Sequence, residues 1–266
     1  MQSVERLLAM VEELLPRLTS PAAGEGVHSR QFAAAALARC TSLFRGIYLV
    51  TIHNQEDAAG PSVRALCETW GVGMYALLGP PHAIPDLAHD AAEFFRKMKN
   101  EYEELEPLTP ELARFFDDNA ALFAGLAQQA RKDKHGNPRK FNYRDLFYSD
   151  LPPLLARHQP AWCDLSQVAY THVYRPETMF GSHAGFLSIE GYIDDSGDPW
   201  RVRRRPRRPY QERNALNAGA LLLGHLASAV AAAFGFDGAS FEEALNTVKD
   251  ELKAAPPDSG PGPEVT

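Results

Sequence analysis

The sequence predicts an all-α fold, a helical bundle interrupted by one small inserted β-hairpin that carries a basic arm. Apolar residues recur at the three- and four-residue spacing of helices over most of the 266 residues. Proline, glycine and capping residues mark the ends of several of these segments. Hydrophobic content of 45% and charged content of 23% are typical of a chain that folds into a globular domain.

The expected order begins with an amphipathic helix within residues 1–22. This segment lacks the basic start and long apolar core of a signal peptide, so we interpret it as part of the fold. A single helical-bundle domain is expected over residues 28–254, with an insertion at about 187–210. The last segment, APPDSGPGPEVT over residues 255–266, is rich in proline and glycine and is expected to be disordered.

Four helices are expected in the first half of the domain, over residues 30–53, 60–79, 86–104 and 110–131. Pro61 suits the first turn of the second of these helices, whereas Pro80 and Pro81 cannot continue it. Thr109 can cap the fourth helix, with Pro110 in its first helical position.

The second half is expected to hold a surface loop, a helical pair, the hairpin and two closing helices. The loop RKDKHGNPRKFNYRD is basic and turn-rich, and the hairpin turns at DDSGD. Ser240 and Glu243 form a capping-box pattern that introduces the last helix. The other helices are placed over residues 146–158, 164–178 and 211–234.

Charge is distributed unevenly along the chain. The formal net charge is −7, yet six arginines lie between positions 201 and 208 with no acid among them. Pro206 and Pro209 favour an extended arm over a helix, which suits contact with a phosphate backbone. The alternative is a solvated strand, or an arm that pairs with the acidic residues of this chain. The predicted nucleic-acid-binding residues are Arg203, Arg204, Arg205, Arg207 and Arg208.

Three cysteines, at positions 40, 67 and 163, are too few and too dispersed for a disulfide framework or a closed zinc site. We expect buried thiols and a cytoplasmic protein. The apolar run over residues 218–236 approaches the length of a membrane span, but it contains His225 and much alanine. A buried central helix is therefore expected, with no membrane partner.

The stretch YTHVYRPETMFGSHAG, residues 170–185, concentrates side-chain chemistry. A metal site would use His172, Glu177 and His183, but their spacing matches neither His-Glu-x-x-His nor the Glu-x-x-His pairs of di-iron bundles. The chain has no Gly-x-Ser-x-Gly elbow and no glycine-rich phosphate loop. We therefore expect no metal and no cofactor.

Arg64 and Glu68 lie four residues apart, one above the other on a predicted helix. If both side chains are exposed, they form an ordinary surface ion pair. If they are partly buried, the arginine is a fixed cation for a phosphate or a developing anion. Gly71, about one turn further on, would let another polar helix approach closely. Tyr170 and Tyr174 share a face if the later helix persists through position 173.

These features together resemble a known family. A long helix, then SVRALCETW with Arg64 and Glu68, and much later the 170–185 stretch before a long terminal helix, resemble the bacterial family called domain of unknown function 5677. The resemblance covers about residues 30–235. Tyr174 matches the family tyrosine, Thr178 stands where serine is usual, and His183 matches the family histidine about one residue late. Pro176 departs from the pattern.

That family looks like a relative of the HEPN superfamily, helical bundles whose active members are metal-independent ribonucleases in toxin and phage-defence systems. The resemblance implies a catalytic set of Arg64, Glu68, Tyr174 and His183, RNA as a partner, and a homodimer. The superfamily signature of an arginine followed at four to six residues by a histidine is missed, because seven residues separate Arg175 from His183. Ribonuclease activity is therefore an analogy.

Three functions stay open from the sequence. The first is an RNA-binding protein or ribonuclease of phage defence, in which His183 moves the 2′-hydroxyl proton and an arginine steadies the phosphate. The second is a noncatalytic interaction module whose polar cluster fixes helix register. The third is a bundle that binds a small molecule or a metal.

Overall fold

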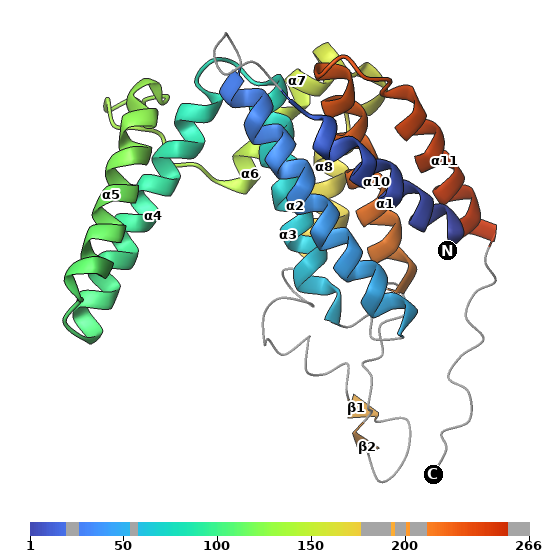
Figure 1. Cartoon of the computed structure of the whole chain (residues 1–266), viewed down its shortest axis with the longest axis horizontal. Helices are drawn as coiled ribbons and strands as arrows, with labels where there is room; N and C mark the ends of the chain where they lie inside the picture. The colour runs from blue at the N-terminus through green and yellow to red at the C-terminus, as the bar shows by residue number, and fades with distance from the viewer. Residues whose placement is uncertain (20–26, 54–57, 177–192, 195–200, 203–211, 255–266) are drawn as a thin grey trace. The chain divides into compact units, whose positions relative to one another are not determined.

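The computed structural model describes residues 1–19, 27–53, 58–176, 193–194, 201–202 and 212–254, and these residues are almost entirely helical (Figure 1). The main helices are α1 Gln2–Leu14, α2 Val27–Ile52, α3 Gly60–Leu78, α4 Ala83–Leu105, α5 Pro110–Leu126, α7 Leu151–His158, α10 Glu212–Ala233 and α11 Ala239–Ala254. The shorter ones are α6 Tyr143–Asp145 and α8 Leu165–Ala169. The predicted helical bundle is confirmed.

Two very short strands pair in antiparallel fashion, β1 Ile193–Asp194 with β2 Arg201–Val202. The residues on either side of each strand lie outside the described part of the chain. The predicted hairpin as a whole therefore stays a prediction, and so does the disordered tail over residues 255–266.

Contacts group the chain into two compact units. Unit 1 comprises Met1–Ser20, Ala34–Trp70 and Val168–Thr266, and unit 2 comprises Pro21–Ala33 and Gly71–Gln167. Helices α2, α3 and α8 each contribute residues to both units. Helix α1 belongs to unit 1, where it packs against α10 and α11. The single domain expected over residues 28–254 contains parts of both units.

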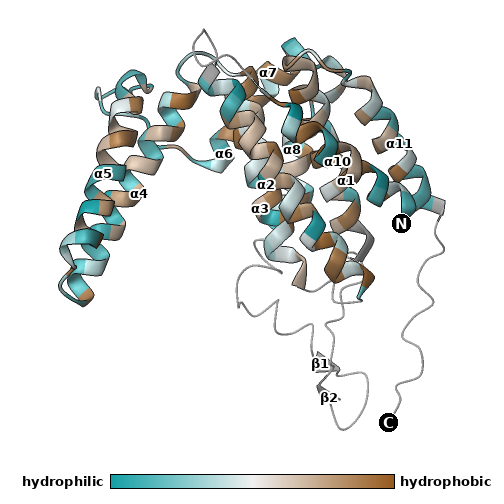
Figure 2. Cartoon of the chain, viewed as in Figure 1, coloured by the Kyte–Doolittle hydropathy of each residue, from teal (hydrophilic) through white to brown (hydrophobic). Residues whose placement is uncertain are grey.

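The core of unit 1 is formed by apolar faces at helical spacing. Leu7 and Val11 of α1, Phe44 of α2, and Leu223 and Leu226 of α10 are fully buried. Helix α11 begins at Ala239, so the capping box expected at Ser240 is wrong. Asp237 accepts the Ala239 N–H instead, which satisfies one of the free donors of the first helical turn. Figure 2 shows the apolar residues of these helices.

Two described helices are long and apolar enough to cross a membrane by length and composition, His28–Ile52 and Ala215–Ala233. The second is 78% buried, as expected for a central core helix. Core helices of globular proteins pass the same test, so this observation is weak evidence for a membrane span.

Two π-turns interrupt the expected helical pair, at Leu146–Asp150 and Tyr170–Tyr174. In each, a backbone N–H bonds to the carbonyl five residues earlier, Leu151 to Leu146 and Arg175 to Tyr170. Prolines follow both turns, at positions 152–153 and 176. Proline lacks an N–H and its ring collides with the carbonyl four residues earlier, and a wider turn relieves this clash.

Glycine lets α10 approach α2 closely in unit 1. A Cβ on Gly219 would lie 2.5 Å from Cδ2 of the buried Phe44, whereas a Cβ on Gly46 would meet nothing within 4 Å. We expect Gly219→Ala to lower the free energy of unfolding by about 1–3 kcal/mol, because the ring must move in a filled core. Gly46→Ala, the matched control, should raise it by about 0.5–1 kcal/mol through helix propensity alone.

Urea denaturation of the two glycine variants checks this prediction. Equal stabilisation by both alanines would contradict the close packing of α2 against α10.

Candidate functional site

Helix α3 places Arg64 and Glu68 on one face of unit 1. Arg64 Nε donates to Glu68 Oε1 at 3.0 Å, and each side chain is 24% exposed. The pair is thus half-buried, between the exposed and the buried alternatives that the spacing allowed. A guanidinium held in this way is a fixed cation whose orientation a carboxylate sets.

Tyr174, from the π-turn after α8, joins this pair. Arg64 Nη2 donates to the Tyr174 hydroxyl at 3.3 Å, and its Cζ lies 5.1 Å from the ring centroid. Tyr170 stacks on Tyr174 with centroids 5.0 Å apart and 16° between the ring planes. Both tyrosines are partly exposed. A cation beside the face of an aromatic ring is stabilised by the partial negative charge of that face.

The packing beneath the cluster holds these elements in register. Cys67 Sγ donates weakly to the carbonyl of Ala169, 3.7 Å away, and this contact links α3 to the end of α8. Burial raises the pKa of the Cys67 and Cys40 thiols well above the usual value, so both stay protonated and unreactive. Cys163 is only partly buried, in contrast to the expectation for all three cysteines.

Electrostatics keep both polar partners in their ordinary protonation states. Burial lowers the pKa of Arg64, but the hydrogen bond to Glu68 and the neighbouring charges together raise it by more. The net shift of the Arg64 pKa is therefore upward. Burial raises the pKa of Tyr174 against the opposing effect of Arg64. At neutral pH Arg64 is therefore a cation and Tyr174 a neutral hydroxyl, which suits a hydrogen-bond donor better than a general base.

The structure thus brings together three of the four residues of the predicted catalytic set, Arg64, Glu68 and Tyr174. His183 lies outside the described residues. The same holds for the predicted binding arm, Arg203, Arg204, Arg205, Arg207 and Arg208.

Two neighbouring expectations concern His172 and Gly71. His172 is exposed on the π-turn, whereas Glu177 and His183, the other residues of the metal alternative, lie outside the described residues. Among the described residues, no three His, Cys, Asp or Glu side chains are grouped so that they could hold a metal ion. The close approach expected at Gly71 involves a different element. A Cβ there would lie 2.8 Å from Cζ of Phe147, so Gly71 makes room for the first π-turn rather than for the segment that carries Tyr174.

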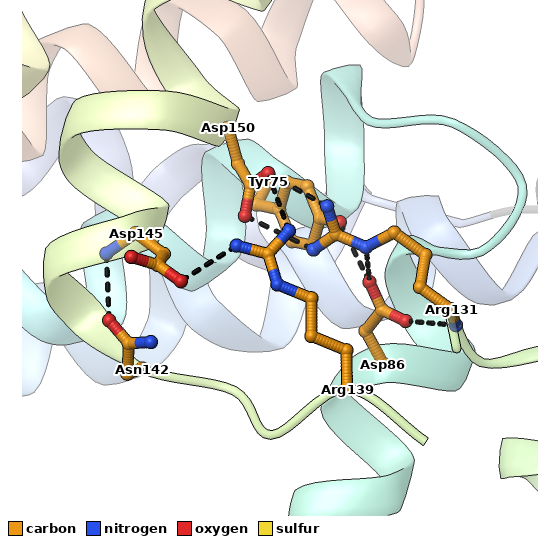
Figure 3. Close-up of polar contacts among 7 residues, drawn as sticks. All are labelled: Tyr75, Asp86, Arg131, Arg139, Asn142, Asp145 and Asp150. Carbon is orange, nitrogen blue, oxygen red and sulfur yellow. Dashed lines mark hydrogen bonds and ion pairs between the residues drawn. The ribbon is translucent and has the colours of Figure 1, made fainter. Parts of the chain in front are cut away.

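A second polar cluster, in unit 2, was not predicted (Figure 3). Arg131 Nε bonds to Asp86 Oδ2 at 2.6 Å, and its Nη1 and Nη2 bond to both carboxylate oxygens of Asp150 at 2.8 and 3.1 Å. Tyr75 donates to Asp86 Oδ2 at 3.0 Å and lies under the guanidinium. Arg139 bonds to the more exposed Asp145 at 2.7 Å.

This cluster ties together the start of α4, the segment after α5 and the first π-turn. The Asp86 side chain is 3% exposed and the Asp150 side chain 13%. The hydrogen bond to Asp150 raises the pKa of Arg131 above its usual range, so the guanidinium stays charged. Every polar atom of the guanidinium faces an acid, so we assign the cluster a structural role.

A buried histidine, His225, lies in the central helix that the apolar run predicted, but its partner Trp70 was not predicted. Trp70 Nε1 donates to His225 Nδ1 at 3.2 Å inside unit 1, and the histidine is 1% exposed. Burial lowers the pKa of His225 to about 4, so the imidazole is neutral at physiological pH. Its position in an alanine-rich apolar run is the only sequence signal that could have indicated burial.

Comparisons of this chain with protein-family models, with curated proteins and with solved structures returned no match. The resemblance noted from the motifs therefore stays an expectation.

Proposed function

We propose that the chain binds single-stranded RNA at Arg64, Tyr170 and Tyr174, and that it cleaves the RNA without a metal ion. One observation carries the binding proposal: Arg64 is held by Glu68 against a stacked pair of partly exposed tyrosines. Stacked aromatic rings beside an arginine suit an unpaired base and its phosphate, because every base has a face that can stack.

Each residue has a distinct role in this proposal. Arg64 contacts a phosphate oxygen, since guanidinium geometry matches phosphate. Glu68 positions the guanidinium, and Tyr170 offers a stacking surface. The net charge of −7, which already includes the arginine arm, opposes RNA binding by the surface as a whole. The arm from Arg203 to Arg208 therefore supplies a local concentration of positive charge for the phosphates.

Cleavage follows from the resemblance rather than from the described geometry. His183 accepts the 2′-hydroxyl proton as the 2′-oxygen forms a bond to phosphorus. The bond to the 5′-oxygen breaks, and that oxygen takes up a proton from water as it leaves. Arg64 stabilises the charge that develops on the phosphate. Because the pKa of Tyr174 is raised, its hydroxyl stays protonated and serves as a hydrogen-bond donor, not as the general base.

Fluorescence anisotropy with a labelled single-stranded RNA at low salt tests binding. We expect Arg64→Gln to weaken binding by about tenfold, and Tyr170→Leu by about fivefold or more through lost stacking. Arg6→Gln, on the exposed face of α1, removes the same charge elsewhere in unit 1 and should change affinity little. Wild-type protein without RNA affinity, or equal losses in all three variants, would contradict the proposal.

Incubation with total RNA in the presence and absence of EDTA tests cleavage. We expect cutting that EDTA does not affect and that His183→Ala stops without a change in melting temperature. Loss of cutting in EDTA would indicate a metal-dependent enzyme. Binding without cutting in the wild-type protein would leave an RNA-binding protein and refute the catalytic part.

The second candidate is a noncatalytic interaction module. The observation in its favour is that Glu68 and Tyr174 already engage Arg64 within the bundle, so the cluster can simply fix the register of the later helix against α3. In that case Arg64→Gln lowers the melting temperature, and the wild-type protein shows no RNA affinity even at low salt.

A further inference from the structure

The α4–α5 helical hairpin of unit 2 exposes a row of large apolar side chains. Successive residues on a helix turn by 100°, so the four members from α5 fall within about 80° of one another. Such a row on one side of a helix normally faces a protein core. We call this row the hairpin face: Phe94, Leu112, Phe115, Leu122 and Leu126, which are 57%, 36%, 52%, 60% and 42% exposed.

The contributions of α4 and α5 form a single surface. The Phe95 ring lies 5.7 Å from Phe94 and 5.9 Å from Phe115, and it stacks on Phe123 at 5.7 Å. Figure 2 shows apolar segments along both helices. Single exposed apolar side chains are ordinary, but a contiguous apolar patch on a folded chain marks an interaction surface.

The two ends of the hairpin carry opposite charge. At the tip, between positions 101 and 111, there are five glutamates and no lysine or arginine. Glu101 and Glu103 pair with lysines of α4, so the exposed excess of acid is at Glu104, Glu106 and Glu111.

The base is basic. The segment over residues 131–140 follows α5. The backbone N–H of Arg131 donates to Asp86 Oδ1, near the start of α4, with an N–O distance of 2.8 Å. The arginines of this segment pair with acids of unit 2, and the segment also carries three exposed lysines, Lys132, Lys134 and Lys140, against one exposed acid, Asp133. Tip and base are separated by the length of α5, about 25 Å for 17 residues.

We propose that the hairpin face binds a second copy of this chain, with the two hairpins antiparallel. A two-fold axis through the middle of the face places the acidic tip of each copy beside the basic base of the other, and the apolar residues pair between them. The parallel arrangement would place glutamates against glutamates. The product is a four-helix arrangement that covers the apolar face of both copies.

This inference is independent of RNA binding, because all of its residues lie in unit 2. Sedimentation velocity of the full chain over a concentration series tests it. We expect a dimer at low salt whose dissociation constant rises by at least about tenfold in Phe115→Glu and in Leu122→Glu, as for central apolar interface residues. Ala121→Glu adds the same charge to α5 at an exposed position away from the face and should leave the dimer intact.

Charge reversal tests the antiparallel orientation. Glu104→Lys with Glu106→Lys should weaken the dimer, as should Lys132→Glu with Lys134→Glu, and the four changes together should restore it. A monomer at every concentration, or a dimer that Phe115→Glu leaves intact, overturns the proposal. A tip reversal without effect would overturn the antiparallel arrangement. Melting temperatures near the wild-type value show that the variants fold.

Discussion

Replacing Arg131 with methionine is expected to lower the free energy of unfolding of unit 2 by about 3–5 kcal/mol, because it leaves two carboxylates with little solvent and without their cation. Asp86 and Asp150 both direct oxygens at the guanidinium, with N–O distances between 2.6 and 3.1 Å. Methionine keeps much of the stem of the side chain, so the loss reports on the charge rather than on a cavity.

Arg139→Met is the matched control (Figure 3). Its main partner, Asp145, is 40% exposed, and ion pairs of this kind contribute no more than about 1 kcal/mol. Urea denaturation, with hydrogen exchange followed separately in residues 71–167, measures both variants. Asp86→Asn added to Arg131→Met should recover part of the loss, because it removes one unpaired charge. Equal small effects of Arg131→Met and Arg139→Met would contradict a buried ion network.

The second large effect is a loss of stability in acid caused by His225. In the unfolded chain this histidine binds a proton below about pH 6.5, whereas in the folded chain its pKa is about 4. Between these values unfolding takes up a proton, so stability falls as pH falls. The loss from this group is about 2 kcal/mol at pH 5 and about 3 kcal/mol at pH 4.

Urea midpoints at pH 7 and pH 5 check the size of this effect. His225→Gln keeps an acceptor for the Trp70 indole N–H but does not titrate, so the difference in stability between the two pH values should shrink by about 2 kcal/mol. His135→Gln, the control in an exposed loop of unit 2, should show the same dependence of stability on pH as the wild-type protein. An unchanged pH dependence in His225→Gln would show that the buried imidazole is not the responsible group.

Local sequence determined where the helices from α2 to α5 lie, because residues within a turn of a helix end favour or disfavour its continuation. Thr109, for example, accepts the Leu112 N–H and Pro110 follows it, as the capping pattern predicted. The four-residue spacing of Arg64 and Glu68 likewise predicted their ion pair, since both partners lie on one helix. The match of the helix bounds is not complete, since α4 begins at residue 83 instead of 86 and α5 ends at 126 instead of 131.

Only tertiary structure decided which distant residues meet. Tyr174 reaches Arg64 across 110 positions, and Asp86, Arg131 and Asp150 come from three separate segments. Helical spacing indicates neither meeting. The family resemblance alone grouped Tyr174 with Arg64, and the second cluster was not predicted. The prolines after both π-turns are visible in the sequence, but whether the helix breaks, kinks or widens before a proline depends on the packing around it. His225 is neutral because Trp70 and the core around α10 bury it. Burial depends on how the helices pack and not on the residues next to His225 in the sequence.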